Sequence, residues 1–251
     1  MMKKIGFVFG VILIISSGGF SQEKPTAFDI IDKIDQNMVF DTAYTETDMI
    51  ITIKNRTITK SMISYAKGNQ KSYLEFLSPA RDKGTKILKI EDIVKIYYPS
   101  AERVMRLSGH MLRRSMMGSD FSYEDMTERS TKLKEEYSGE IKGEETINGR
   151  PCYVLVLTSK IPKQTYFTRK AWVDKERYIG LKEELYAKSG KLLKVMIAHD
   201  IQSYQNRFYP MRVTMEDKLR KDSKTEVVFK KIEFDVSIPE GTFSERRLMK
   251  K

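Results

Sequence analysis

Apolar and polar residues alternate along most of this chain, and this period of two constrains the fold more than any other feature. Residues 211–216 show it most clearly, with Met and Val at the odd positions and Arg, Thr and Glu at the even ones. Successive side chains of a strand point to opposite faces, so such runs predict antiparallel strands with one apolar and one solvated face. We count about eleven strands between Tyr44 and Phe234, and a one-sided sheet of that length has to curl.

Two segments interrupt the alternation and are expected to cover the sheet. Residues 25–38 have apolar residues at helical spacing, which predicts an amphipathic helix. Residues 108–126 predict a short helix from Gly109 to Met117 that Ser108 caps and Gly118 ends. The expected fold class is α+β, mainly antiparallel β, a curved open half-barrel covered by roughly two or three helices. So few helices cannot easily fill a curled sheet of that size, and we therefore expect a hydrophobic cavity.

Methionine is the positive signal for a binding cavity. The chain contains 14 Met among 251 residues, and the flexible thioether suits surfaces that adapt to varied apolar shapes, although ordinary core filling is the competing interpretation. The expected cavity floor consists of apolar strand residues, namely Met49, Ile51, Leu74, Phe76, Leu181, Leu185, Met211, Val213 and Met215. The lid, our name for residues 108–126, is expected to turn five apolar side chains toward this floor, namely Met111, Leu112, Met116, Met117 and Phe121. Four arginines could meet an acidic partner or a lipid headgroup, or could simply keep the surface soluble, namely Arg103, Arg106, Arg113 and Arg114.

Groups that carry catalysis or bind metals are scarce and badly placed. The two histidines, His110 and His199, lie in different expected elements, and neither has a metal-ligand neighbour at useful spacing. Carboxylate pairs such as Glu183–Glu184 are neighbours on expected strands and therefore point to opposite faces. Cys152 is the only cysteine, so no internal disulfide can form. We therefore expect no enzymatic activity, no metal site and no cofactor.

The first residues have the layout of a secretory signal peptide. Basic residues precede an apolar run from Ile5 to Ile15, which is shorter than the ~20 residues of a spanning helix, and small residues lead to a cut before Gln22. An uncleaved anchor is the alternative. We expect residues 1–21 to be removed and residues 22–251 to fold as a single domain in the periplasm. No cysteine stands directly after the apolar run, so no lipid can be attached there.

The charge balance is basic, with 45 Lys and Arg against 34 Asp and Glu. A basic surface can meet nucleic acid, anionic lipid or an acidic protein, and export argues against nucleic acid. The basic residues are spread along the expected strands, which favours a solvated strand face. We expect the last basic residues, Arg246, Arg247, Lys250 and Lys251, to form a solvated tail, and the protein to be a monomer.

Residues 117–125, Met-Gly-Ser-Asp-Phe-Ser-Tyr-Glu-Asp, resemble the outer-membrane lipoprotein-sorting protein family, the LolA-like proteins. Residues 98–104, the pair Arg113–Arg114 and residues 84–86 fit the same pattern. The resemblance extends from the first expected helix to Phe243, and its most specific part is the Gly-Ser-Asp-Phe-Ser-Tyr core.

The resemblance implies a strongly curved LolA/LolB-like half-barrel with helices over a hydrophobic cavity. It implies a periplasmic carrier, a chaperone that binds the acyl chains of lipoproteins or other lipids for transfer toward the outer membrane. An inner-membrane RND-type exporter or an outer-membrane acceptor is the partner that it suggests. Two alternatives stay open: a non-enzymatic interaction module or exporter accessory with a filled concave face, and an enzyme with polar groups converging inside the cavity.

Overall fold

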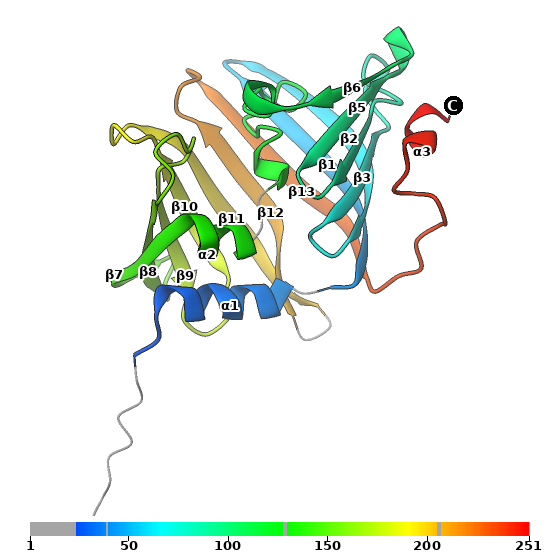
Figure 1. Ribbon diagram of the computed structural model, residues 1–251. Helices are drawn as coiled ribbons and strands as arrows, with labels where there is room; N and C mark the ends of the chain where they lie inside the picture. The colour runs from blue at the N-terminus through cyan, green and yellow to red at the C-terminus, as the bar shows by residue number, and fades with distance from the viewer. Residues whose placement is uncertain (1–23, 39, 128–129, 205–206, 251) are drawn as a thin grey trace, which may run out of the picture.

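One antiparallel sheet curls around a concave face in the computed structural model, which describes residues 24–38, 40–127, 130–204 and 207–250 (Figure 1). The expected signal peptide, residues 1–21, lies outside the described residues. Within the described part there are thirteen strands: β1 (Thr42–Ile53), β2 (Arg56–Lys67), β3 (Lys71–Phe76), β4 (Lys86–Ile90), β5 (Ile93–Tyr98), β6 (Arg103–Leu107), β7 (Tyr137–Ile147), β8 (Arg150–Ser159), β9 (Thr168–Asp174), β10 (Gly180–Tyr186), β11 (Leu192–Tyr204), β12 (Arg207–Asp217) and β13 (Ser223–Phe234). Three α-helices are described with them: α1 (Ala27–Met38), α2 (Ser130–Glu136) and α3 (Glu245–Met249).

The order of the strands explains why a lid crosses the sheet. The order is β6-β5-β4-β3-β2-β1-β13-β12-β11-β10-β9-β8-β7. The chain starts in the middle with β1, runs outward to β6 at one edge, enters β7 at the other edge and returns to β13 beside β1. The connection from β6 to β7 therefore has to pass from one edge of the sheet to the other, and it contains both the lid and α2.

The expected class is confirmed, while the count of about eleven strands and three local predictions are wrong. β6 was not expected as a strand, because its apolar residues do not alternate cleanly. Residues 109–117 do not form one helix: only Gly109–Met111 make a 3-10 turn, and the Ser108 side chain makes no capping hydrogen bond. The sequence also predicts that strands resume near Leu133, but Leu133 belongs to α2.

The N-terminal helix forms where the helical spacing predicted it. Its first turn is capped reciprocally: the Thr26 hydroxyl accepts from the Asp29 backbone N–H at 3.2 Å, and the Asp29 carboxylate accepts from the Thr26 N–H at 2.7 Å. Gly139 of β7 permits the close approach of this helix, since a Cβ there would lie 3.1 Å from the Ala27 Cβ and 2.9 Å from the Leu157 side chain. The helix is thereby fixed across the β7–β12 half of the sheet (Figure 1).

Two apolar clusters divide the concave face. The lid core, as we call it, joins buried residues of β1–β6 to the lid residues Met116 and Tyr123. The α1 core joins Ile30 and Ile31 of the helix to residues of β7–β9 such as Leu155. The two halves of the sheet are thus covered by different segments of the chain.

The C-terminal residues are packed against the outer face of the sheet, which corrects the expectation of a solvated tail. Leu248 of α3 is fully buried against Tyr73, Leu88 and Tyr97. The Lys86 ammonium group donates to the carbonyl oxygen of Lys250. The tail was predicted from its charged residues, and Arg246 and Arg247 directly precede the buried Leu248 within α3. The charges therefore concealed the side chain that anchors the helix.

Candidate functional site: an apolar cavity beneath α1

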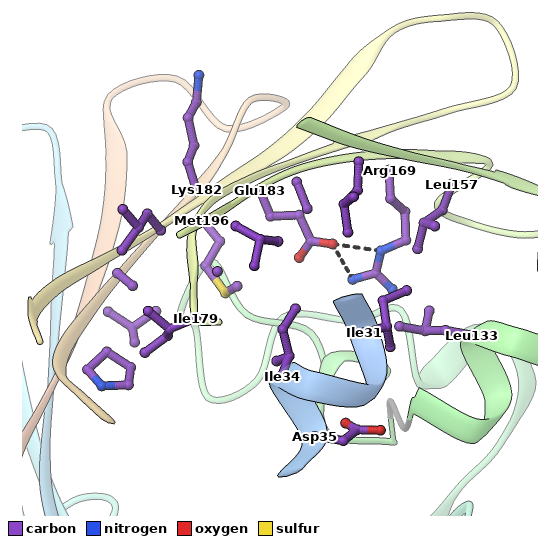
Figure 2. A pocket seen from close by; sticks show the side chains of 18 residues that line it. Ile31, Ile34, Asp35, Leu133, Leu157, Arg169, Ile179, Lys182, Glu183 and Met196 are labelled. Atoms are coloured by element: carbon purple, nitrogen blue, oxygen red, sulfur yellow. Dashed lines mark hydrogen bonds and ion pairs between the residues drawn. The ribbon is translucent and has the colours of Figure 1, made fainter. Parts of the chain in front are cut away.

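A cavity of about 340 Å³ lies between α1 and the concave face of strands β8–β12 (Figure 2). Ile31 and Ile34 of α1 face it from one side, and Leu133 of α2 contributes from the same layer. The opposite wall is made of strand residues that are almost all apolar, namely Leu155, Leu157, Ala171, Val173, Leu181, Met196, Ala198 and Val213. This volume lies within the range of small-molecule sites, which is about 300–1,000 Å³.

The cavity exists because small side chains of β9–β11 lie opposite α1. Ala171 of β9 and Ala198 of β11 lie in its wall, and Gly180 begins β10 beside them. Lys182, although it borders the cavity, points away from it (Figure 2), and its ammonium group contacts Glu184 at 2.6 Å. The apolar volume is therefore left open by short residues and is not occupied by a charged side chain.

A row of charged residues closes the lid side of the cavity, namely Arg169, Glu183 and Lys194. Arg169 and Lys194 pair with Leu185 of β10 from opposite sides. Glu183, also on β10, pairs with Ala171 and Met196 one step closer to α1. The Arg169 guanidinium donates to the Glu183 carboxylate at 2.8 and 2.7 Å (Figure 2). Arg169 is buried, so this charge is compensated within the protein as buried charges must be.

The same row holds the lid. The Lys194 ammonium group lies 2.7 Å from one oxygen of Asp125, and the Tyr166 hydroxyl donates to the other at 2.6 Å. The backbone N–H of Ser122 also donates to Asp125, at 2.7 Å. Burial, with the Asp125 carboxylate beside it, raises the pKa of Tyr166, so its hydroxyl keeps its proton and remains a donor. One end of the lid is therefore tied to β11 and to the segment just before β9.

Asp120 ties the middle of the lid to β12 and β13. Its carboxylate accepts from the Thr225 hydroxyl at 2.6 Å, and its own N–H donates to that hydroxyl at 2.9 Å. The Arg220 guanidinium donates to the Ser119 carbonyl at 2.6 Å and to the Gly118 carbonyl at 3.0 Å. Ser119 and Asp120 are both buried. The Gly-Ser-Asp-Phe-Ser-Tyr core is thus the anchoring segment of the lid and supplies no residue to the cavity wall.

The expected floor residues are divided among several regions, and one of these regions also contains the expected lid residues. Four floor residues, namely Met49, Ile51, Leu74 and Phe76, lie in the lid core, where all five expected lid residues, namely Met111, Leu112, Met116, Met117 and Phe121, pack against or within it. Leu181 and Val213 line the cavity beneath α1. Leu185 and Met215 are buried near it, and Met211 packs in a cluster with Tyr209 and Phe229. The methionines of the lid fill the half that they cover.

Several cavity residues were not expected from the sequence. Ile31 and Ile34 were part of the predicted helix stripe, and that stripe was the available signal that something apolar lies beneath α1. Ala171 and Ala198 gave no signal, because a small residue in a strand does not show whether its neighbours leave space.

The four arginines proposed for a partner or headgroup are all exposed, two on β6 and two in the lid. Within residues 24–38, 40–127, 130–204 and 207–250, no group of three His, Cys, Asp or Glu side chains could hold a metal ion. None of the described helices is both long and apolar enough to cross a membrane. Cys152 is buried, and burial raises the pKa of its thiol.

Solved structures of the same architecture place this half-barrel in a known class. The chain is similar to a DUF1329 family protein from Desulfovibrio piger, with 26% identity and a TM-score of 0.82 over 88% of this chain and 97% of that one. It is similar to a putative outer membrane lipoprotein-sorting protein domain from Vibrio parahaemolyticus, with 22% identity and a TM-score of 0.80 over 89% and 98%. A LolA superfamily protein from Nitrosomonas europaea gives 22% identity and a TM-score of 0.73 over 89% and 100%.

The fold is therefore that of the LolA-like proteins, as the lid motif predicted. A family model described as an uncharacterized protein matches residues 68–250, more than half of the chain, and the chain belongs to that family. No curated protein matches the sequence.

Proposed function

We propose that this protein is a non-enzymatic carrier that holds an acyl chain of a lipid or lipoprotein in the cavity beneath α1. The observation that carries the proposal is the apolar cavity of about 340 Å³ within a LolA-like half-barrel. The expected signal peptide supports a site of action in the periplasm, where such a carrier would move its cargo toward the outer membrane.

The size of the cavity limits the cargo. A water-sized group occupies about 30 Å³, and a methylene is of similar size, so 340 Å³ holds roughly eleven such groups. That is one acyl chain or part of one, whereas several chains would need the lid to leave the lid core. Burying roughly ten methylenes gains about 8 kcal/mol. Association subtracts at least about 4 kcal/mol, so the cargo is held reversibly, as release requires.

The charged row beside the cavity supports an amphiphilic cargo. Arg169 and Glu183 line one end of a wall that is otherwise mostly apolar, and Lys194 lies beside them on β11. A chain would lie between α1 and the strands, and its polar head would face this row. The row offers hydrogen-bonding groups already held by their neighbours, with no histidine or serine placed to act on the head. This arrangement favours holding over catalysis.

Lipid analysis by native mass spectrometry of protein purified from its host tests the proposal. We expect a bound amphiphile, together with a lower unfolding temperature after its removal. A variant with Ala171→Leu and Ala198→Leu, which fills the cavity, should bind a fluorescent fatty acid at least tenfold more weakly and unfold no earlier than the wild type. Ala101→Leu, which makes one such substitution at an exposed site, is the control. Equal binding by the filled variant and the wild type would show that this cavity is not the site.

A further inference from the structure

The two hairpins at the end of the sheet opposite α1 form a surface with a composition of its own (Figure 1). The β1–β2 and β12–β13 hairpins lie side by side there: Ile53 pairs with Ser223, and the Lys54 N–H donates to the Asp222 carbonyl at 2.7 Å. We call this surface, formed by residues 53–59 and 218–222, the hairpin surface. It lies at the ends of four strands from the middle of the sheet, β1, β2, β12 and β13.

Large aliphatic side chains stand exposed on the hairpin surface. Ile53 is 38% exposed, Ile58 is 52% exposed and Leu219 is 58% exposed. Ile53 and Ile58 line an open groove that also includes Ile51, and Ile51 is a buried member of the lid core. The apolar concave surface therefore continues past the edge of the lid and into solvent. Such continuity marks an interaction site more strongly than scattered apolar residues do.

Positive charges surround these aliphatic residues. Lys54, Arg56 and Lys221 are exposed and take part in no ion pair within the described part of the chain. Two acidic neighbours are already paired within the protein. Glu216 forms an ion pair with Lys218, and Glu226 forms one with Lys224 at 3.1 Å. Asp222 is the one exposed acidic residue of the hairpin surface. The surface thus presents uncompensated positive charge beside apolar side chains.

We propose that the hairpin surface docks on a membrane that contains anionic phospholipid. Lys54, Arg56 and Lys221 would contact phosphate groups, while Ile58 and Leu219 would enter the region between the headgroups and the acyl chains. Basic residues combined with protruding aliphatic ones are the combination that binds the interface of an anionic bilayer. A folded protein partner would more naturally be met by a flat patch, whereas these side chains project from two hairpin ends. This docking goes beyond the cavity and does not depend on what the cavity holds.

Flotation of the purified protein with vesicles tests the proposal. The wild type should float with vesicles of phosphatidylethanolamine and phosphatidylglycerol and not with phosphatidylcholine alone. The variant Lys54→Gln/Arg56→Gln/Lys221→Gln should lose roughly two orders of magnitude in binding to the anionic vesicles. The matched control Lys24→Gln/Lys67→Gln/Lys142→Gln removes three exposed charges elsewhere and should keep most of the binding.

A second pair of variants separates apolar insertion from charge. Ile58→Gln/Leu219→Gln should weaken vesicle binding at least tenfold, whereas Met249→Gln, at a residue 56% exposed on α3, should not. Far-UV circular dichroism and unfolding temperatures establish that the variants fold. Failure of the wild type to bind protein-free anionic vesicles, or equal binding by the wild type and both hairpin variants, would overturn the proposal. Binding only to native membranes would also overturn it, since it would indicate a protein receptor. The cavity-filled variant Ala171→Leu/Ala198→Leu should float like the wild type, which keeps this test independent of the carrier function.

Discussion

Asp120 and Thr225 are joined by two hydrogen bonds, at 2.6 and 2.9 Å, although 105 residues separate them in the chain. Both residues are buried. Asp120 belongs to the connection between the sheet edges, and Thr225 belongs to β13 in the middle of the sheet. The contact therefore fixes where the lid lies along its path across the concave face.

Thr225→Val should loosen the lid without changing the shape of the core. The substitution removes the hydroxyl that Asp120 uses both as a donor and as an acceptor, which should lower the free energy of unfolding by about 1–3 kcal/mol. Urea unfolding gives this value, and hydrogen exchange should show faster exchange in residues 111–125 than in β3. Thr57→Val, at an exposed threonine, should change stability by less than about 0.5 kcal/mol. An unchanged urea midpoint for Thr225→Val would mean that the lid is held by its apolar side chains alone.

The sequence was sufficient for the class of fold and for the existence of a lid, because both depend on local patterns. Alternation predicts strands wherever one face is wet, and the helical spacing around Ile31 predicts α1. The position of the cavity depends instead on which half of the sheet each cover reaches. The half that each covering segment reaches follows from the placement of β6 and β7 at opposite edges of the sheet. That placement is a property of the whole chain.

Leu181 illustrates a local limit of the same kind. Alternation places Leu181 and Leu185 on one face, and both were expected in the cavity floor. A register shift between Gly180 and Lys182 turns Leu181 so that it packs with Trp172 as well as bordering the cavity. A β-bulge adds one residue to one strand only, and the alternation of apolar residues does not show where that residue falls. Ala171 and Ala198, the small residues that leave the cavity open, likewise give no signal in the sequence.

Lys194→Met should destabilise the protein more than the loss of an ordinary ion pair. Lys194 lies 2.7 Å from Asp125, and both side chains are largely shielded from solvent. Removing one partner leaves the Asp125 carboxylate with Tyr166 and Ser122 as its remaining donors among the described residues, and we expect a loss of about 3–5 kcal/mol by urea unfolding. Lys224→Met breaks the more exposed pair with Glu226 and should cost less than about 1 kcal/mol.

The double variant Lys194→Met/Asp125→Asn provides the check on this prediction. The asparagine side chain is uncharged, so the double variant should recover part of the stability that Lys194→Met loses. A double variant that is less stable than Lys194→Met by the full effect of Asp125→Asn would show that the two side chains act independently.

His199 should make the protein less stable in mild acid. Burial and the neighbouring Arg212 guanidinium lower the pKa of His199 from 6.5, although Asp200 and Glu226 oppose the shift. The unfolded chain therefore binds a proton at this site more readily than the folded protein does. The stabilising contribution is present above about pH 6.5 and is lost as the pH falls through the lowered pKa. Urea midpoints measured from about pH 7.5 to about pH 5 should fall less steeply for His199→Gln than for the wild type. Parallel slopes would show that other groups cause the acid sensitivity.

Leu248→Ala should reveal how firmly the C-terminal helix is bound to the outer face of the sheet. Leu248 is fully buried against Tyr73, Leu88 and Tyr97, whereas its neighbour Met249 is 56% exposed. Truncating a fully buried leucine costs about 2–5 kcal/mol, so the unfolding midpoint in urea should drop clearly. Met249→Ala is the matched control, and its effect should stay within about 0.5 kcal/mol because the side chain is mostly in water. If the two substitutions had the same small effect, α3 would be a detachable segment, and the sheet would keep its stability with Tyr73 and Tyr97 uncovered.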